Sequence, residues 1–305
     1  MTWTFRYTTH LGYRPPDFRP QFVATLGTSD PAVHIRHAAE LGMAGILYPW
    51  ALSRPHEEVR AVRRALEVVN LSCSCIVCVP SNELATGIWT DRSVSGRRRL
   101  EDYVHQAAEL AISLKSGVLA ALISSNPDRT DIERQRDDAA ANLRDMARIA
   151  ADSGVRLAVE PMVQLPNMLL RTTNEAIDLL KVADHANLGI IYDTAHVAMM
   201  DGDLVAALRA AADHIALVQI ADQPGRVEAG AGDLAIVDVL VEVLRSGYTG
   251  LVDLEHDWSQ PTREGERSGL EGIRRLDDAV GRRVRPNSGF GLGREGTTSV
   301  ELKGR

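Results

Sequence analysis

The sequence has no apolar run long enough to cross a membrane and no secretory signal at its start. A spanning helix needs about 20 mostly apolar residues, and every apolar run in these 305 residues falls well short of that length. The first ten residues, MTWTFRYTTH, lack the basic and then apolar pattern of a secretory signal. We therefore expect a cytoplasmic protein with no membrane partner.

Excess basic charge is also lacking. The chain carries 34 Lys and Arg residues against 41 Asp and Glu residues, which gives a net charge of -7. Nucleic-acid phosphates are bound by basic surfaces, so this balance argues against a nucleic-acid partner unless a local basic groove is present. The sequence is 45% hydrophobic and 25% charged, as is typical of a soluble globular protein.

Cysteine is scarce, and the three cysteines lie together in LSCSCIVCVP, at positions 73, 75 and 78. Their spacing could indicate a metal site, but no second cluster of Cys or His completes one. The surrounding residues are typical of a buried strand, where Cys acts as a small apolar side chain. We expect these cysteines to pack in the core.

Short apolar runs alternate with amphipathic helical stretches along the whole chain. The predicted strands cover about residues 3–10, 44–50, 71–80, 117–124, 155–161, 187–193, 214–222 and 250–257. Strands that alternate with helices form a parallel sheet, and eight such units in about 280 residues fit a closed (β/α)8 TIM barrel. A doubly wound open sheet is the alternative, but its usual G-x-G-x-x-G turn is missing after the first strand.

Local signals mark several helix ends. Pro31 follows Asp30 at a favoured first-turn position, Thr172 and Glu175 form a capping box, and Asp233 is a predicted cap. We expect one barrel domain over residues 1–283. Residues 284–305 are rich in Gly and polar residues and are predicted to be a flexible tail, or alternatively a packing arm in a homo-oligomer.

Polar side chains end four consecutive predicted strands. Glu160, Asp193 and Glu255 end the fifth, sixth and eighth, and Gln219 interrupts the apolar run of the seventh. Active sites of TIM barrels lie at the carboxyl ends of the strands, so these side chains are expected to meet at one rim. Three carboxylates in a partly buried ring would repel one another and raise one another's pKa.

A divalent cation would remove this repulsion. Oxygen ligands suit a hard ion such as Mg²⁺ or Mn²⁺, so we predict a metal site formed by Glu160, Asp193, Gln219 and Glu255. The amide oxygen of Gln219 would be a neutral ligand, which would explain an amide within a core strand. Each residue taken singly could instead be a surface charge or a loop cap, and only their joint occurrence favours the metal.

Residues nearby have simpler interpretations as well. His196 could begin a helix, Asp222 could stabilise the turn before Pro224, and Arg226 with Glu228 could form a solvated ion pair of under about 1 kcal/mol.

The second half of the chain resembles the xylose isomerase-like barrels, and among them the hydroxypyruvate isomerases. The matching segments, within about residues 156–258, are AVEPM, YDTAHVAMMDGDL, HIALVQIADQPGRVEAGAGD and GYTGLVDLEHD. The resemblance implies that Glu160, Asp193, Gln219 and Glu255 bind the metal. It also implies that Glu160 and Glu255 are catalytic and transfer a proton between adjacent carbons, while His196, Arg226 and Glu228 bind the substrate.

The expected activity is therefore a metal-dependent sugar or hydroxy-ketoacid isomerase or epimerase that works through an enediolate. The segments after the ligands depart from the hydroxypyruvate isomerase pattern at Met162, Ala229 and His256, so the metal is better supported than the substrate. A lyase on the same scaffold, such as a sugar-acid dehydratase, a decarboxylase or a C-glycoside deglycosidase subunit, is the main alternative. A related endonuclease with a His-rich cluster and a non-catalytic binding protein are less favoured.

Overall fold

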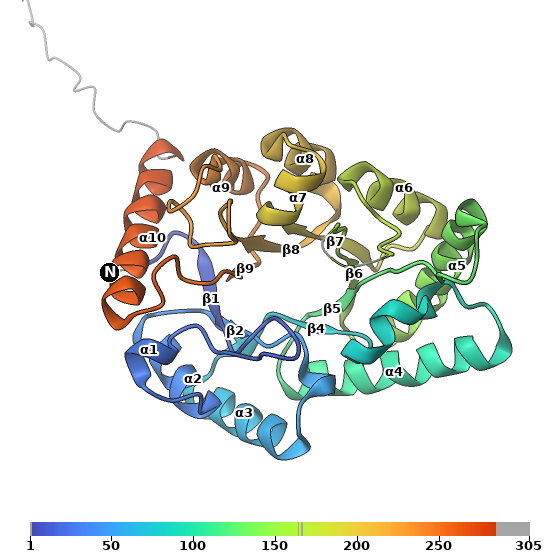
Figure 1. Cartoon of the computed structure of the whole chain (residues 1–305), viewed down its shortest axis with the longest axis horizontal. Coiled ribbons are helices and arrows are strands. Elements are labelled where there is room, and N and C mark those ends of the chain that lie inside the picture. The colour runs from blue at the N-terminus through green and yellow to red at the C-terminus, as the bar shows by residue number, and fades with distance from the viewer. Residues whose placement is uncertain (1, 164, 166, 285–305) are drawn as a thin grey trace, which may run out of the picture.

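The protein is a closed parallel barrel surrounded by helices (Figure 1). The computed structural model describes residues 2–163, 165 and 167–284. The strands are β1 (Arg6–His10), β2 (Gly45–Leu47), β3 (Ser72–Cys73), β4 (Cys75–Val77), β5 (Val118–Ala121), β6 (Arg156–Val159), β7 (Leu188–Asp193), β8 (Ile215–Ile220) and β9 (Leu251–Leu254). Each neighbouring pair is parallel, in the order β3-β2-β1-β9-β8-β7-β6-β5-β4. This confirms the predicted TIM barrel.

One predicted strand is broken into two. The two ends of the strand order, β3 and β4, are separated in sequence by Ser74 alone. The cysteine run therefore forms a single interrupted strand whose first part pairs with β2 and whose second part pairs with β5. Nine strand segments thus build the eight positions of the barrel.

Helices form the outer layer in Figure 1. Their bounds are α1 (Val23–Leu26), α2 (Pro31–Glu40), α3 (His56–Val69), α4 (Val94–Ser113), α5 (Ile132–Asp152), α6 (Thr173–Ala183), α7 (Thr194–Met200), α8 (Leu204–Ala211), α9 (Ile236–Arg245) and α10 (Arg263–Val284). Short 3-10 helices are η1 (Ala51–Ser53), η2 (Ser81–Thr86), η3 (Ile88–Thr90) and η4 (Ala212–His214). None of the helices in the described part of the chain is both long and apolar enough to cross a membrane.

The ends of the described chain are joined to each other. The Glu266 carboxylate of α10 accepts hydrogen bonds from the backbone N–H groups of Ala24 and Thr25 in α1, and Asp277 accepts one from Thr4. These bonds attach the last helix to the start of the chain. Val284 is helical, one residue beyond the predicted barrel boundary, and the predicted tail over 285–305 lies outside the described residues.

Several local predictions are confirmed and one is wrong. Asp30 caps α2, and Thr172 accepts a hydrogen bond from the N–H of Glu175 at the start of α6. Asp233 does not cap α9, which begins after Ala235 without a side-chain cap. Asp233 lies in the loop before α9, where its N–H donates to the carbonyl of Gln223 and the N–H of Leu234 donates to the Asp222 carboxylate. The short helix α1 was not predicted from the sequence, and α7 was indicated only by the alternative interpretation of His196 as a residue that begins a helix.

Strand alternation divides the core into two layers. Successive side chains of a strand point to opposite faces, and one face of each strand packs against the helices in the larger apolar cluster. The other face points into the barrel, where a second cluster contains Leu47, Cys75, Val77, Ala120 and Leu122. The buried, free cysteines are divided between the two layers, which confirms that they pack in the core.

Candidate active site

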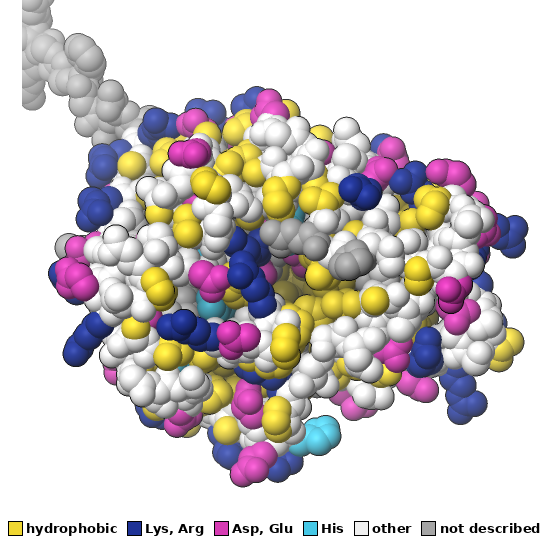
Figure 2. All heavy atoms as spheres, viewed as in Figure 1, with side chains coloured by type: hydrophobic (Ala, Val, Ile, Leu, Met, Phe, Trp, Pro, Cys, Tyr) yellow, Lys and Arg dark blue, Asp and Glu magenta, His cyan; other side chains and the backbone are white. Residues whose placement is uncertain are grey.

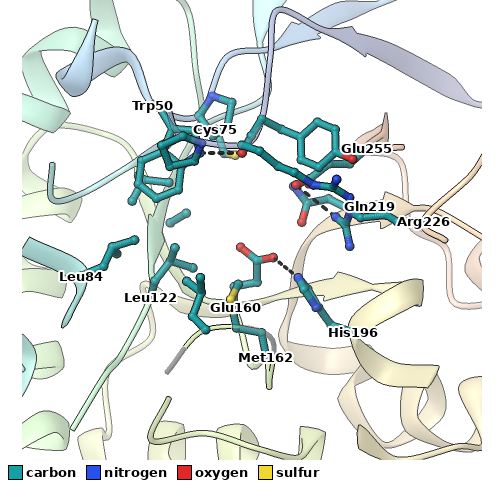
Figure 3. Close-up of a pocket in the computed structure, with 17 residues that line it drawn as sticks. Trp50, Cys75, Leu84, Leu122, Glu160, Met162, His196, Gln219, Arg226 and Glu255 are labelled. Carbon is teal, nitrogen blue, oxygen red and sulfur yellow. Dashed lines mark hydrogen bonds and ion pairs between the residues drawn. The ribbon is translucent and has the colours of Figure 1, made fainter. Parts of the chain in front are cut away.

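A cavity of about 310 Å³ opens at the carboxyl end of the barrel. Figure 2 shows a hollow at the centre of this face, with apolar side chains along one side and charged side chains along another. The predicted residues that line the cavity are Glu160, His196, Gln219, Arg226 and Glu255. Figure 3 shows them converging from the ends of neighbouring strands. The structure therefore brings most of the predicted site together.

Asp193 lies behind this lining. It ends β7 and caps α7, where its Oδ1 accepts the N–H of His196 at 2.9 Å. Its side chain is buried and also receives the guanidinium of Arg226, at 3.2 Å to Oδ1 and 2.7 Å to Oδ2. Burial by itself would raise the pKa of Asp193, but the charge of Arg226, the neighbouring His196 and the hydrogen bonds from both residues together lower this pKa below its usual value.

Arg226 links two of the predicted metal ligands. In addition to Asp193, its Nη2 lies 3.1 Å from Oε1 of Glu255. The arginine has a left-handed backbone (φ 53°) directly after Gly225 (φ 96°), which is uncommon for a residue other than glycine. A two-way backbone pairing of Asp222 with Val227 closes this turn. The turn thus directs a buried cation into the barrel, and the predicted solvated Arg226–Glu228 pair is wrong.

Glu160 and His196 form the opposite side of the site. Nε2 of His196 lies 3.5 Å from Oε1 of Glu160, as Figure 3 marks. Burial, followed by the charge of Asp193, raises the pKa of Glu160 to about 8. Burial lowers the pKa of His196 to about 4, so the imidazole is neutral near pH 7. Its Nδ1 is buried and has no hydrogen-bond partner among the described residues.

The floor of the site contains a residue that the sequence analysis missed. Asp253, two residues before Glu255 on β9, is fully buried. It accepts hydrogen bonds from the hydroxyls of Thr8 at 2.6 Å and Ser74 at 3.0 Å, and from the Gln219 amide at 3.4 Å. Burial raises its pKa to about 7 despite these donors. Its position two residues before Glu255 is the signal that could have found it, because alternate residues of a strand point to the same face.

The residues present fit a divalent cation. Four buried carboxyl groups, Glu160, Asp193, Asp253 and Glu255, meet one buried guanidinium, so negative charge is in excess. Burial raises the pKa of Glu255 well above its usual value in spite of Arg226. Gln219 Oε1 and Glu255 Oε2 are buried and unpartnered among the described residues. A hard cation would use these oxygens and relieve the repulsion.

A second arrangement of donors is also present. Glu160, Asp193 and His196 each offer one atom, and these three atoms lie within 4.8 Å of one another. His196 could therefore contribute a nitrogen ligand next to two of the predicted oxygen ligands. The two sets share Glu160 and Asp193.

Glu228 does not belong to this cavity. Its carboxylate accepts hydrogen bonds from the backbone N–H and the hydroxyl of Ser259, both at 2.7 Å. It lies in a separate hollow beside α10. The expectation that Glu228 binds the substrate is thus not supported, because its oxygens accept hydrogen bonds from the loop after β9. Asp222, as its simpler interpretation predicted, organises its turn by accepting the N–H groups of Gln223, Gly230 and Leu234.

Comparison with known proteins agrees with this architecture. The family model described as xylose isomerase-like TIM barrel matches residues 35–278. A hydroxypyruvate isomerase of Escherichia coli strain K12 is 27% identical over 79% of this chain and 93% of its own length. A 3-dehydroshikimate dehydratase of Pseudomonas aeruginosa is 32% identical over 46% of this chain and 24% of its own length.

A solved structure has the same fold. The D-psicose 3-epimerase of Clostridium cellulolyticum H10 superposes with a TM-score of 0.73, covers 89% of this chain and 99% of its own, and shares 16% of its residues. At this identity the likeness concerns the fold alone. Because the family model spans most of the barrel, from α2 to α10, the chain belongs to the xylose isomerase-like TIM barrel family.

Proposed function

We propose that this protein is a divalent-metal-dependent isomerase or epimerase that acts on a small sugar or hydroxy-ketoacid through an enediolate. The observation that carries the proposal is the pair of buried glutamates, Glu160 and Glu255, which face one cavity from different strands with raised pKa values. The likeness to a hydroxypyruvate isomerase over most of both chains supports the same reaction class.

Glu160, Asp193, Gln219 and Glu255 would hold the cation, with Mn²⁺ or Mg²⁺ expected from their oxygen donors. When bound, such an ion polarises a carbonyl and stabilises negative charge on its oxygen. The adjacent C–H becomes more acidic, so one glutamate can remove its proton and the other can return a proton to the neighbouring carbon. Figure 3 shows Glu160 and Glu255 on different sides of the cavity, as two such roles require.

His196 and Arg226 would bind substrate oxygens. Neutral His196 lines the cavity and has an unpartnered Nδ1, so it can donate or accept one hydrogen bond. Arg226 is held rigidly by Asp193 and Glu255, and its positive charge favours an oxygen that becomes negative during the reaction.

Isotope exchange tests this proposal. The protein is incubated with Mn²⁺ and a panel of ketoses and hydroxypyruvate in deuterated water. We expect deuterium at a carbon next to a carbonyl, loss of exchange after chelation, and loss of exchange in both Glu160→Gln and Glu255→Gln. Failure of every panel member to exchange in the Mn²⁺-loaded, folded protein would overturn it.

A lyase is the second candidate, favoured by the 32% identity to a 3-dehydroshikimate dehydratase over about half of this chain. Dehydration also begins with removal of a proton next to a carbonyl, so the same glutamates would serve. Mass spectrometry of the products separates the two reactions, because an isomerase conserves substrate mass and a dehydratase releases water.

A further inference from the structure

The two sides of the cavity differ in chemistry. The polar side comes from the ends of β6, β7, β8 and β9 and carries Glu160, His196, Gln219, Arg226 and Glu255. The facing side comes from β4 and β5 and the segment after β2. Its side chains are Pro49, Trp50, Cys75, Val77, Ala120 and Leu122. Leu84 of η2 and Met162 extend this apolar wall, as Figure 3 shows.

The polar atoms of the apolar wall are already in use. The indole N–H of Trp50 donates to the carbonyl of Tyr13 at 2.7 Å. Backbone groups of β4 and β5 are paired within the sheet. Burial raises the pKa of the Cys75 thiol well above its usual value, so the sulfur stays neutral. A substrate hydroxyl placed here would lose its water without gaining a partner.

The cavity also lacks a free cation in its described lining. Arg226 is paired with Asp193 and Glu255. Arg14, the other arginine of the lining, lies at the rim with half of its side chain exposed and pairs with Asp257 at 2.9 Å. A phosphate at the far end of a substrate would lie against the apolar wall, where it would lose its water without gaining a donor.

Resting on the function proposed above, we infer that the natural substrate has two unlike ends. The reacting end is a hydroxy-ketone directed at the carboxylates, and the far end is an uncharged, deoxygenated group such as a methyl, alkyl or aryl substituent against the apolar wall. The volume of about 310 Å³ agrees with this inference, because it is at the lower limit of ordinary small-molecule pockets of about 300–1,000 Å³. A three-carbon acid would leave the apolar wall uncovered.

Matched substrates test the inference directly. The Mn²⁺-loaded protein is given a ketohexose, its 6-deoxy analogue, its 6-phosphate and a 6-deoxy-6-phenyl analogue, and kcat/KM is measured by deuterium exchange. We expect the deoxy compound to exceed the parent by about tenfold, because one buried hydroxyl loses its partner. The phenyl analogue should equal or exceed the deoxy compound, and the phosphate should be the poorest. A parent ketose or phosphate that matches the deoxy compound would overturn the inference.

Variants of the wall provide the matched control. Leu122→Asn keeps the approximate size and adds an amide, so the preference for the deoxy compound should fall to about twofold or less. Leu122→Met keeps the wall apolar and should retain the wild-type preference. Should Leu122→Asn fail to fold, Val77→Thr makes the same change of polarity with a smaller side chain. Equal preference in the polar and apolar variants would contradict a role for this wall.

Binding separates this inference from the proposed reaction. If no compound exchanges deuterium, the isomerase proposal fails, and titration calorimetry with the same compounds then decides the inference alone. Tighter binding of the deoxy and phenyl compounds than of the parent would support it. Equal or absent binding of all four compounds would overturn it.

Discussion

The side-chain amide of Gln219 faces the carboxylate of Asp253, with Nε2 at 3.4 Å from Oδ2. The hydroxyls of Thr8 and Ser74 donate to the same carboxylate, so Asp253 acts as an acceptor for three donors. The amide nitrogen of Gln219 is therefore turned toward Asp253. Its oxygen, buried and unpartnered among the described residues, is left for a ligand.

Replacing Asp253 should weaken metal binding without removing a metal ligand. In Asp253→Asn, the side chain has one acceptor oxygen in place of two, so the Gln219 amide N–H loses its acceptor. The Gln219 oxygen then loses its fixed direction. We expect Mn²⁺ affinity, measured by calorimetry, to fall by about 10- to 100-fold, the usual effect of residues that orient ligands.

Asp277→Asn is the control for that experiment. Asp277 is also buried, but it lies on α10 and accepts the backbone N–H of Thr4. This variant should lower stability and leave Mn²⁺ affinity unchanged. Wild-type Mn²⁺ affinity in a folded Asp253→Asn protein would show that Asp253 does not orient Gln219.

Arg226 should be essential to the stability of the metal-free protein. Arg226→Met would leave Asp193 and Glu255 buried without their shared cation, and breaking such a buried pair costs about 3–5 kcal/mol in free energy of unfolding. Mn²⁺ should restore more stability to this variant than to the wild type, because the ion supplies the missing positive charge. Chemical denaturation with and without Mn²⁺ measures both effects.

An exposed arginine supplies the comparison. Arg209→Met removes an ion pair with Glu242 at the surface, and a small loss of stability, well below that of Arg226→Met, is expected. If Arg226→Met is as stable as the wild type in the absence of metal, the buried ion pairs of Arg226 with Asp193 and Glu255 do not stabilise the metal-free protein.

Metal affinity should increase with pH. Burial and Asp193 raise the pKa of Glu160 to about 8, so near neutral pH this carboxyl retains a proton that a bound cation must displace. The apparent affinity for Mn²⁺ should rise as pH increases toward about 8, and the raised pKa of Glu255 should extend this rise. Calorimetry in buffers of different ionisation enthalpy would detect the released proton. Glu160→Gln should bind Mn²⁺ more weakly, with a flatter pH dependence; an equally steep profile would assign the proton to another group.

Glu228 should be important for stability and unimportant for turnover. Glu228→Ala would remove the acceptor of two hydrogen bonds from Ser259 and should cost about 1.5–3 kcal/mol, the range for hydrogen bonds to a charged group. KM and Mn²⁺ affinity should stay at their wild-type values. Ser259→Ala retains the backbone donor and should cost less. A raised KM in Glu228→Ala would instead support a role for Glu228 in substrate binding.

The barrel and much of its site could be predicted from local patterns. Alternation of apolar strands with amphipathic helices is enough to indicate a parallel barrel. Parallel strands end at a common rim, so Glu160, Gln219 and Glu255 were expected to meet. The period of two along a strand then decides which side chains face inward. These properties depend on neighbours within a few positions, and the sequence expresses them directly.

Contacts between distant segments decided the rest. Arg226 reaches Asp193 only because a turn closed by Asp222 and Val227 directs it inward, while Glu228, two residues later, is directed away to Ser259. The role of Asp253 likewise arises where β1, β8 and β9 meet the break at Ser74. The sequence determined which residues reach the rim. The tertiary structure decided which of them form ion pairs, because ion pairing depends on distances that no local pattern contains.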